Sequence, residues 1–484
     1  MKVRKIILGL CVTLAFCSCS DWLDVSPSNQ VDGDDLFNSG NGYRIALNGI
    51  YKQVSGQYLW GQELTWGTVD VLAQSYDKSS LGSTNTQYRE LASYKYTNKS
   101  VEPLIQSIWS TAYNAIANCN ELIGNIENAD PQIFQGKTLE RDLIHGEALA
   151  LRAMLHFEML RLFAPSVVAD DGKKYIPYYE SFPSISESYL TVNEVLAKVK
   201  ADLEYARQLV QSYDDDGGYK LLMTTDYRFT GNGMSDIFYA CRGFRMNYIA
   251  IVALQARVFS YAGETKKAYD AATEVIDYQD GNGNKMFSFT ATSDFGTNPK
   301  MKDDLILAFS NQKEVELFKN WDDDGEGTGM MMIDYDTYQE ILNENQNDRR
   351  WNRDGGMIAD FADEYYCVMS KKYTDDASYS EADKRIVPVI RLSEMYYIRG
   401  EYLAETDPSA GAGELEMVAQ ARGCTAGYFD YVSTLSEYQE AVLKDARKEF
   451  LGEGQLYYFY KKYNILPARG TDFVFPLPDS ELVY

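Results

Sequence analysis

Histidine is scarce in this chain of 484 residues, which contains only His145 and His156. Two histidines cannot form a three-histidine metal site, and they leave little room for Ser-His-Asp or Cys-His catalysis. Positive charge is also scarce, because 46 Lys and Arg stand against 71 Asp and Glu and the net charge is −25. Phosphate backbones are bound by clustered cations, so this composition argues against a nucleic-acid partner.

Recognisable catalytic motifs are missing as well. The chain has no G-x-S-x-G elbow, no phosphate-binding G-x-x-x-x-G-K-[ST] loop, no G-x-G-x-x-G and no H-E-x-x-H. A glycoside hydrolase needs two carboxylates about 5 to 10 Å apart. In a chain with 71 acidic residues, some pair can always be proposed, so the presence of acidic pairs is no evidence for a glycoside hydrolase. We predict that the protein is not an enzyme, and keep a glycoside hydrolase as the less favoured alternative.

Long hydrophobic runs are limited to the N-terminus. Lys2, Arg4 and Lys5 precede an apolar stretch at residues 6–17, which is too short to span a bilayer and is typical of a secretory signal. Ser18 then places a small residue directly before Cys19, as in a bacterial lipobox. We predict that residues 1–18 are a signal peptide and that Cys19 is lipidated, with acyl chains holding the protein on a membrane. A plain signal peptide cut nearby is the alternative.

No cofactor or metal is predicted. The cysteines beyond Cys19 are widely spaced, which favours buried single thiols over a disulfide framework or zinc site; they are Cys119, Cys241, Cys367 and Cys424. Asp280 begins an alternation of oxygen side chains like that of an EF-hand loop. Lys285 and Ala291, however, replace the Gly and the bidentate Glu of that loop. The acidic residues around 322–326 could ligate calcium, but a solvated turn is the simpler interpretation.

Helical periodicity dominates what is present. Apolar residues recur every three to four positions at 41–54, 105–126 and 192–210, and the helix at 147–163 has two apolar faces, which predicts that it is sandwiched. Residues 245–276 form a helix, a short turn and a second helix whose Ala256 and Ala268 resemble a tetratricopeptide repeat. Helices at 391–405 and 435–451 are expected to form a further pair. Long polar loops lie between, at 55–100, 277–304, 319–334 and 351–386.

Read in order, these segments resemble the SusD/RagB family of outer-membrane nutrient-binding lipoproteins of Bacteroidetes. The resemblance covers nearly all of the chain after the signal and is carried by Cys19-Ser20-Asp21-Trp22-Leu23-Asp24, Tyr43-Arg44-Ile45-Ala46-Leu47-Asn48-Gly49-Ile50-Tyr51, Gly146-Glu147-Ala148 to Arg161-Leu162-Phe163, Arg391-Leu392-Ser393-Glu394-Met395-Tyr396, Arg447-Lys448-Glu449-Phe450-Leu451-Gly452-Glu453-Gly454-Gln455 and Phe475-Pro476-Leu477-Pro478.

The resemblance implies a mainly α fold. Four tetratricopeptide-like helix pairs form one side, and a loop-rich half with minor β-structure carries the ligand surface. It also implies one SusD-like domain at 19–484, with an N-terminal part at about 19–230 and a C-terminal part at about 240–484. Arg152, Glu394, Arg447 and Glu453 of the family motifs are expected to be paired scaffold charges rather than ligand residues.

The resemblance further implies a non-catalytic, lipid-anchored protein of the outer membrane, facing the cell exterior. Such a protein captures a glycan and delivers it to a SusC-like TonB-dependent transporter. Two alternatives remain beside the hydrolase: a peptide-binding, RagB-like relative, and a helical-repeat scaffold for protein partners.

Sugar recognition needs flat aromatic faces together with amide and carboxylate groups. The loop at 55–100 and a later loop near 321–335 supply both, and glycan-binding relatives use these regions. The predicted ligand residues are Trp60, Trp66, Tyr76, Asp77, Trp321 and Tyr335. The alternative is that these aromatic rings fill the core beneath the loops. The two tryptophans of the first loop favour a glycan over a peptide.

Overall fold

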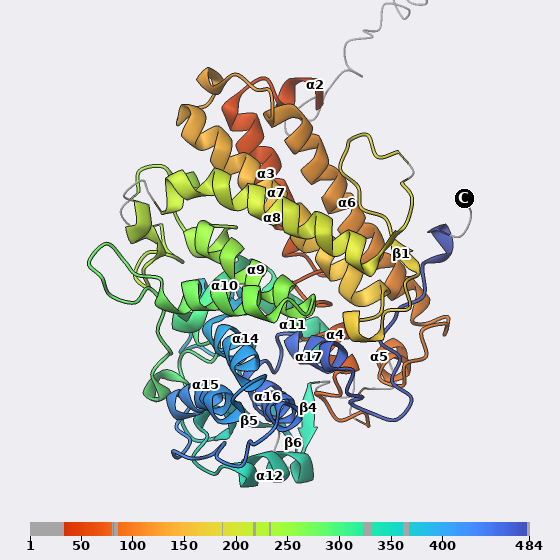
Figure 1. The fold of residues 1–484 in the computed structure, drawn as a ribbon, viewed down its shortest axis with the longest axis vertical. Coiled ribbons are helices and arrows are strands. Elements are labelled where there is room, and N and C mark those ends of the chain that lie inside the picture. The colour runs from red at the N-terminus through yellow and green to blue at the C-terminus, as the bar shows by residue number, and fades with distance from the viewer. Residues whose placement is uncertain are drawn as a thin grey trace, which may run out of the picture.

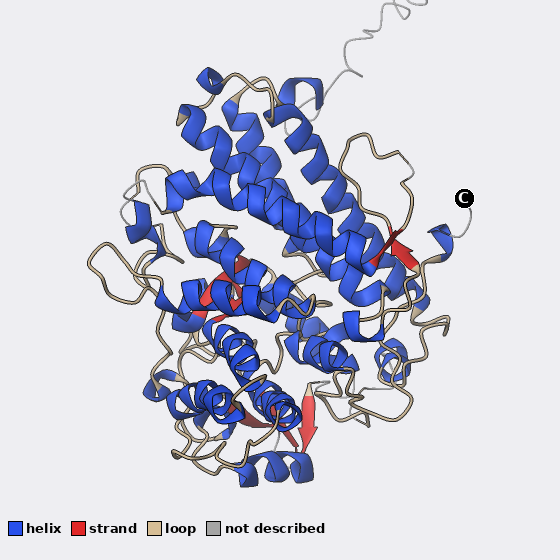
Figure 2. Cartoon of the chain, viewed as in Figure 1, coloured by secondary structure: helices blue, strands red, loops and turns tan. Residues whose placement is uncertain are grey.

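The computed structural model describes residues 33–481 except 80, 82–85, 186, 216–218, 232–233, 323–330 and 362–366. The predicted signal peptide and Cys19 lie outside the described residues. Helices dominate the chain and strands are few and short (Figure 2), which confirms the predicted mainly α class.

The helices follow one another along most of the chain (Figure 1). In chain order they are α2 (Gly33–Leu36), α3 (Gly40–Val54), α4 (Thr68–Leu72), α5 (Thr86–Leu91), α6 (Glu102–Ile126), α7 (Lys137–Phe163), α8 (Val192–Asp214), α9 (Tyr248–Tyr261), α10 (Thr265–Asp277), α11 (Glu314–Asp322), α12 (Tyr335–Glu344), α13 (Glu381–Lys384), α14 (Leu392–Ala404), α15 (Pro408–Ala421), α16 (Leu435–Glu449) and α17 (Gln455–Tyr463). Among the described residues, no helix is both long enough and apolar enough to cross a membrane.

Four helix pairs are stacked in chain order. α3 packs with α6, α7 with α8, α9 with α10, and α14 with α15, while α6 contacts α7, α8 contacts α9 and α10 contacts α14. This arrangement agrees with the predicted repeat-like pairs. One prediction was wrong: α14 is paired chiefly with α15, a helix not foreseen, rather than with the helix at 435–451. α15 begins with Asp407 as its N-cap and Pro408 in its first turn.

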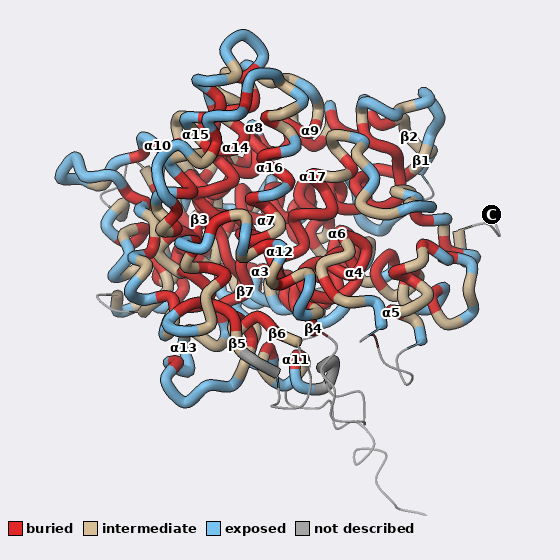
Figure 3. Tube along the Cα trace, turned by 90° about the horizontal axis from the view of Figure 1, so that it is seen from below, coloured by how far each residue is buried: buried red, intermediate tan, exposed pale blue. Residues whose placement is uncertain are grey.

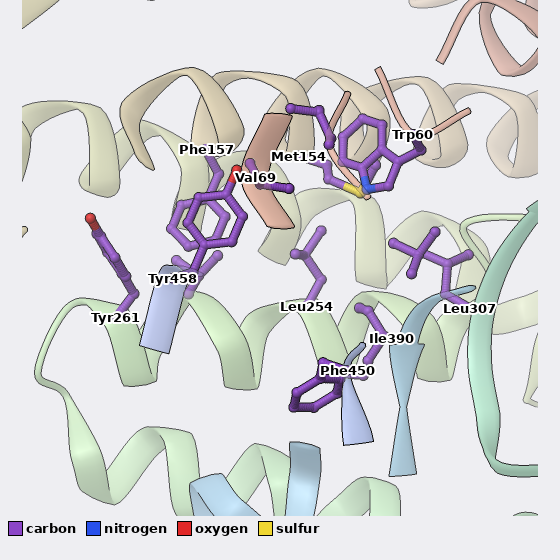
Figure 4. Packing of buried hydrophobic residues seen from close by; sticks show 14 of the residues in the cluster. Trp60, Val69, Met154, Phe157, Leu254, Tyr261, Leu307, Ile390, Phe450 and Tyr458 are labelled. Carbon is purple, nitrogen blue, oxygen red and sulfur yellow. The ribbon is translucent and has the colours of Figure 1, made fainter. Parts of the chain in front are cut away.

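The long helix α7 lies between its neighbours, as predicted. Every residue from 143 to 163 is buried. A Cβ added at Gly146 would lie 2.6 Å from a methyl group of Val210 in α8, so this glycine allows the two helices to approach closely. Figure 4 shows Met154 and Phe157 of α7 meeting Leu254 of α9 in the core.

In the described part of the chain, the strands form three small antiparallel sheets. Their order is β1-β2, β3-β7 and β4-β6-β5. The strands are β1 (Lys174–Ile176), β2 (Leu190–Thr191), β3 (Leu305–Ser310), β4 (Met332–Asp334), β5 (Ile358–Phe361), β6 (Cys367–Ser370) and β7 (Ile386–Arg391). In the third sheet Ile333 of β4 is opposite Val368 of β6. Short strands and helices therefore occupy parts of the predicted loops at 319–334 and 351–386.

Three of the four motif charges are buried and paired, as expected. Nε and Nη2 of Arg152 each donate to Asp202 at 2.8 Å, Glu394 accepts from Arg257 at 2.6 Å, and Glu453 accepts from Lys372 at 2.6 Å. Arg447 is different. It is half-buried, and the ion pairs among the described residues do not include it.

Candidate functional site

The tryptophans predicted to stack on a sugar are core residues. Trp60 is 1% exposed and Trp66 is fully buried. Trp60 meets Phe309 of β3 edge-on, with ring centroids 5.4 Å apart, and lies beside Met154 (Figure 4). Trp66 packs against Phe318 of α11 and its indole N–H donates to Glu314 at 3.1 Å. Neither ring offers a face to a ligand, so the assignment of both as stacking residues is corrected.

Tyr76 is also a structural residue. It is 7% exposed, and its hydroxyl donates to the backbone oxygen of Trp66 at 3.0 Å. Tyr88, Tyr94 and Tyr96 of the same loop are buried, whereas Tyr58 is exposed. The aromatic rings of this loop therefore mostly belong to the core beneath it. In Figure 3 the buried residues, in red, run through the interior of the trace, and the exposed ones, in pale blue, lie mostly at its edges.

Asp77 and Tyr335, predicted from separate loops, come close together through strand β4. The backbone N–H of Asp77 donates to the oxygen of Met332 at 2.8 Å, and Tyr335 begins α12 directly after this strand. Tyr335 is 36% exposed and Asp77 is half-buried. We call the region around them the Tyr335 surface; it consists of Asp77, Asp334, Tyr335, Arg353 and Cys367.

Arg353, Asp334 and Cys367 of this surface were not among the ligand residues predicted from the sequence, and Arg353 is the one that contacts the exposed tyrosine ring. Its guanidinium carbon lies 5.4 Å from the ring centroid of Tyr335 and 4.8 Å from that of Tyr338. The Tyr335 and Tyr338 rings are 6.0 Å apart, and Arg353 therefore supports the exposed tyrosine from one side by cation–π contact. No local pattern indicates this role, because the contact joins Arg353 to rings of the separate helix α12.

The carboxylates of the Tyr335 surface are hydrogen-bond acceptors. Asp334 caps α12 by accepting from the backbone N–H of Thr337 at 2.9 Å. Burial by itself raises the pKa of Asp334, but the hydrogen bonds from Thr337 outweigh it and lower the pKa. Burial, with the charges of Asp77 and Asp334, raises the pKa of the Cys367 thiol. The surface thus combines an aromatic ring, a guanidinium and carboxyl groups, which together suit a hydroxyl-rich ligand.

Trp321 belongs to the last turn of α11, but its side chain lies outside what the structure describes. Its predicted role stays a prediction.

Both histidines are structural. Burial lowers the pKa of His145 to about 4 and that of His156 well below its ordinary value, so both rings are neutral at pH 7. His156 accepts from the backbone N–H of Tyr179 at 3.0 Å and stacks on Tyr178 at 3.7 Å. Within the described part of the chain, no group of three or more His, Cys, Asp or Glu side chains could hold a metal ion.

Comparisons with known proteins agree with this fold. Residues 21–224 match a SusD-like family described as starch-binding and associating with the outer membrane. A SusD superfamily protein from Bacteroides thetaiotaomicron is 24% identical, with 88% of this chain and 89% of that chain covered at a TM-score of 0.63. One from Bacteroides fragilis is 16% identical, with 93% and 98% covered at a TM-score of 0.65.

Two relatives carry more specific descriptions. A laminarin-binding SusD-like protein is 15% identical, with 92% of this chain and 96% of that chain covered at a TM-score of 0.59. "SusD-like protein P2" of Formosa agariphila is 24% identical over 208 residues. That match covers 43% of this chain and 38% of the length of the relative.

Proposed function

We propose that the chain is a non-catalytic glycan-binding protein of the cell surface, because it is similar to SusD-like proteins in sequence over residues 21–224 and in fold over most of its length. In this proposal Cys19 carries the lipid anchor on the outer membrane, the protein faces the cell exterior, and it passes its ligand to a SusC-like TonB-dependent transporter. The family description and the laminarin-binding relative support a carbohydrate as the ligand.

The observation that carries the proposal is the meeting of Asp77 and Tyr335. Residues from two distant segments come together at β4 and leave a tyrosine ring 36% exposed beside carboxylates and an arginine. One sugar ring would stack on Tyr335, while its hydroxyls would bond to Asp77 and Arg353. Such contacts are individually weak, which suits a protein that must release its ligand to a transporter.

A peptide is the second candidate. The burial of Trp60 and Trp66 removes the feature that favoured a glycan over a peptide in the sequence. A tyrosine with neighbouring carboxylates and an arginine also suits a peptide with charged side chains.

Native affinity electrophoresis tests the proposal. The chain from Ser20 onward is run through gels that contain laminarin, starch and other plant, host and microbial polysaccharides, and reducing-sugar release is measured in parallel. We expect one polysaccharide to retard the protein without being hydrolysed. Released sugar would contradict the non-enzyme proposal. If no glycan retards the protein, calorimetry with a peptide library tests the second candidate.

A further inference from the structure

A polar cleft separates helix α11 from the short helix α13. It has a volume of about 520 Å³, within the range of about 300 to 1,000 Å³ that is typical of ligand pockets. Its two walls are joined at one end, where the backbone N–H of Asn311 donates to the oxygen of Arg385 at 2.9 Å. The cleft is distinct from the Tyr335 surface, since none of the five residues of that surface lines it.

Glu314 is the buried carboxyl group that lines this cleft. Its side chain is 1% exposed, and its two oxygens accept from the Trp66 indole at 3.1 Å and from the Asn311 amide at 3.2 Å. Two donors hold the carboxyl group in one orientation, and it in turn fixes the Asn311 amide at the wall of the cleft. Burial raises the pKa of Glu314 to about 7, although the charge of Lys300 opposes this.

The opposite wall is held by ion pairs. Asp375 accepts from Lys319 of α11 and from Lys384 of α13, each at 2.7 Å, so that it bridges the two helices. Among the described residues, the lining contains four carboxylates, three cations and no aromatic side chain. Charges that nearly cancel do not select an ion, and the amide and carboxylate groups of the lining can exchange hydrogen bonds with the hydroxyl groups of a sugar.

Trp66 connects the cleft to the Tyr335 surface. Its indole holds Glu314, while its backbone oxygen accepts from the hydroxyl of Tyr76, the residue before Asp77. The tryptophan that the sequence suggested as a stacking residue therefore lies between two surface regions that are rich in hydrogen-bonding groups.

We propose that the cleft is a second saccharide subsite, in which hydroxyl groups of a neutral glycan bind Asn311 and Gln312 while Glu314 holds the Asn311 amide in place. The Tyr335 surface holds another part of the same glycan chain. This proposal rests on the proposed function, because it assumes that the ligand is a glycan. In it Trp66 is a positioning residue that acts on the ligand through Glu314.

Calorimetry with oligosaccharides of increasing length tests the subsite. They are prepared from the polysaccharide that retards the protein, and the variants are Gln312→Ala and Asn311→Ala. We expect each variant to bind long oligosaccharides about tenfold more weakly, which corresponds to one or two lost hydrogen bonds. Short oligosaccharides that occupy only the Tyr335 surface should bind the variants as tightly as the unaltered protein. Lys313→Ala is the matched control, because this exposed neighbour does not line the cleft.

Trp66→Phe tests the positioning role. It keeps an aromatic ring but removes the indole N–H that holds Glu314. We expect weaker binding of long oligosaccharides only. Hydrogen exchange gives a measurement that needs no variant, since a bound long oligosaccharide should slow exchange at residues 311–319 and 375–385.

Three results would refute the subsite, and they differ in what they say about the proposed function. If Tyr335→Ala weakens binding while Gln312→Ala and Asn311→Ala do not, and exchange is unchanged, the cleft is not a subsite but the glycan-binding function stands. If the unaltered protein binds no glycan, both fail. If it binds a peptide that the cleft variants weaken, the cleft is a peptide site.

Discussion

The carboxylate of Asp70 accepts a hydrogen bond of 2.6 Å from the backbone N–H of Gly452, a residue 382 positions further along the chain. Its other oxygen accepts from Gly454 at 3.0 Å. Gly454 has φ +74°, and a Cβ there would lie 2.4 Å from the backbone oxygen of Leu64. The C-terminal Gly452-Glu453-Gly454 motif is thus a docking point for the N-terminal segment that leads to Asp77.

Asp70→Asn should change the pH dependence of stability. Burial raises the pKa of Asp70 to about 7, although hydrogen bonds from Gly452 and Tyr76 oppose the shift. The folded state therefore binds this proton more tightly than the unfolded chain, whose carboxyl has an ordinary pKa of 3.8. The stability that Asp70 contributes is complete below about pH 4 and is lost as the pH rises to about 7, by on the order of 4 kcal/mol.

The Asp70→Asn variant has no such proton to lose. Its unfolding temperature should therefore change less between pH 5 and pH 7.5 than that of the unaltered protein. At pH 5 the variant should still be about 1 to 3 kcal/mol less stable, because an amide offers one acceptor oxygen to two backbone donors. Asp270→Asn, which alters an exposed carboxylate, is the control. An unchanged pH dependence in Asp70→Asn would show that Asp70 does not carry this proton.

Trp60→Ala should reduce stability rather than remove a ligand contact. The side chain is 1% exposed and packs in the main core, and truncating such a residue costs about 3 to 5 kcal/mol. Tyr58→Ala, at 40% exposure in the same segment, should cost about 0.5 kcal/mol or less. Urea unfolding measures both. Equal midpoints for the two variants would mean that Trp60 does not pack as described.

Tyr335→Ala should weaken glycan binding without lowering the unfolding temperature. Loss of one stacking face is worth about 0.5 to 1.5 kcal/mol, or about two- to tenfold in affinity. Calorimetry measures the affinity and thermal unfolding measures the stability. The matched control is Tyr431→Ala, since Tyr431 is 50% exposed and lies outside the Tyr335 surface. If both variants bind alike, Tyr335 is not a ligand residue.

Arg152→Ala should lower the free energy of unfolding much more than Arg447→Ala does, because Arg152 forms an ion pair and Arg447 is in none of the ion pairs of the described residues. Arg152 is 5% exposed and binds Asp202 through two hydrogen bonds of 2.8 Å. Removing it leaves a buried carboxylate without its cation, at a cost of about 3 to 5 kcal/mol. Arg447 is half-buried and outside the ion pairs of the described chain, so its removal should cost about 1 kcal/mol or less. Chemical unfolding measures the stability of both variants. If Arg447→Ala proves less stable than Arg152→Ala, the ion pair between Arg152 and Asp202 does not have the role described.

Cys19→Ser should release the protein from membranes. If Cys19 carries the acyl chains, the serine variant lacks the anchor and should move from the membrane fraction to the soluble fraction. Cys119→Ser serves as a control, because Cys119 is buried in α6 and cannot anchor the chain. A serine variant that stays with the outer membrane would indicate another means of attachment.

Much of the helical scaffold could be predicted from local patterns. The apolar periodicity of residues 147–163 predicts a helix with two apolar faces. These residues form the part of α7 that is buried on all sides. The pair at 245–276 corresponds to α9 and α10, with the turn between them. α15 was missed because its small residues carry little periodic contrast, and its partner α14 was therefore assigned to the wrong helix.

The site was only partly predictable. Asp77 and Tyr335 could be named because acidic and aromatic residues in long loops suit a ligand surface. Their proximity, however, depends on a hydrogen bond between Asp77 and Met332, which are far apart in the chain. Arg353 and Glu314 have no local signal, since each acquires its role only from side chains that the fold brings against it.

The sequence by itself determined the helical class, the family resemblance and the scarcity of groups for metal or histidine chemistry, because these depend on composition and on patterns within short segments. Tertiary structure alone decided which aromatic rings are exposed. Trp66 and Tyr335 each follow a polar residue in the sequence, yet Trp66 is fully buried and Tyr335 is 36% exposed. Exposure depends on what packs against a ring from distant parts of the chain, and here Phe318 and Glu314 cover Trp66.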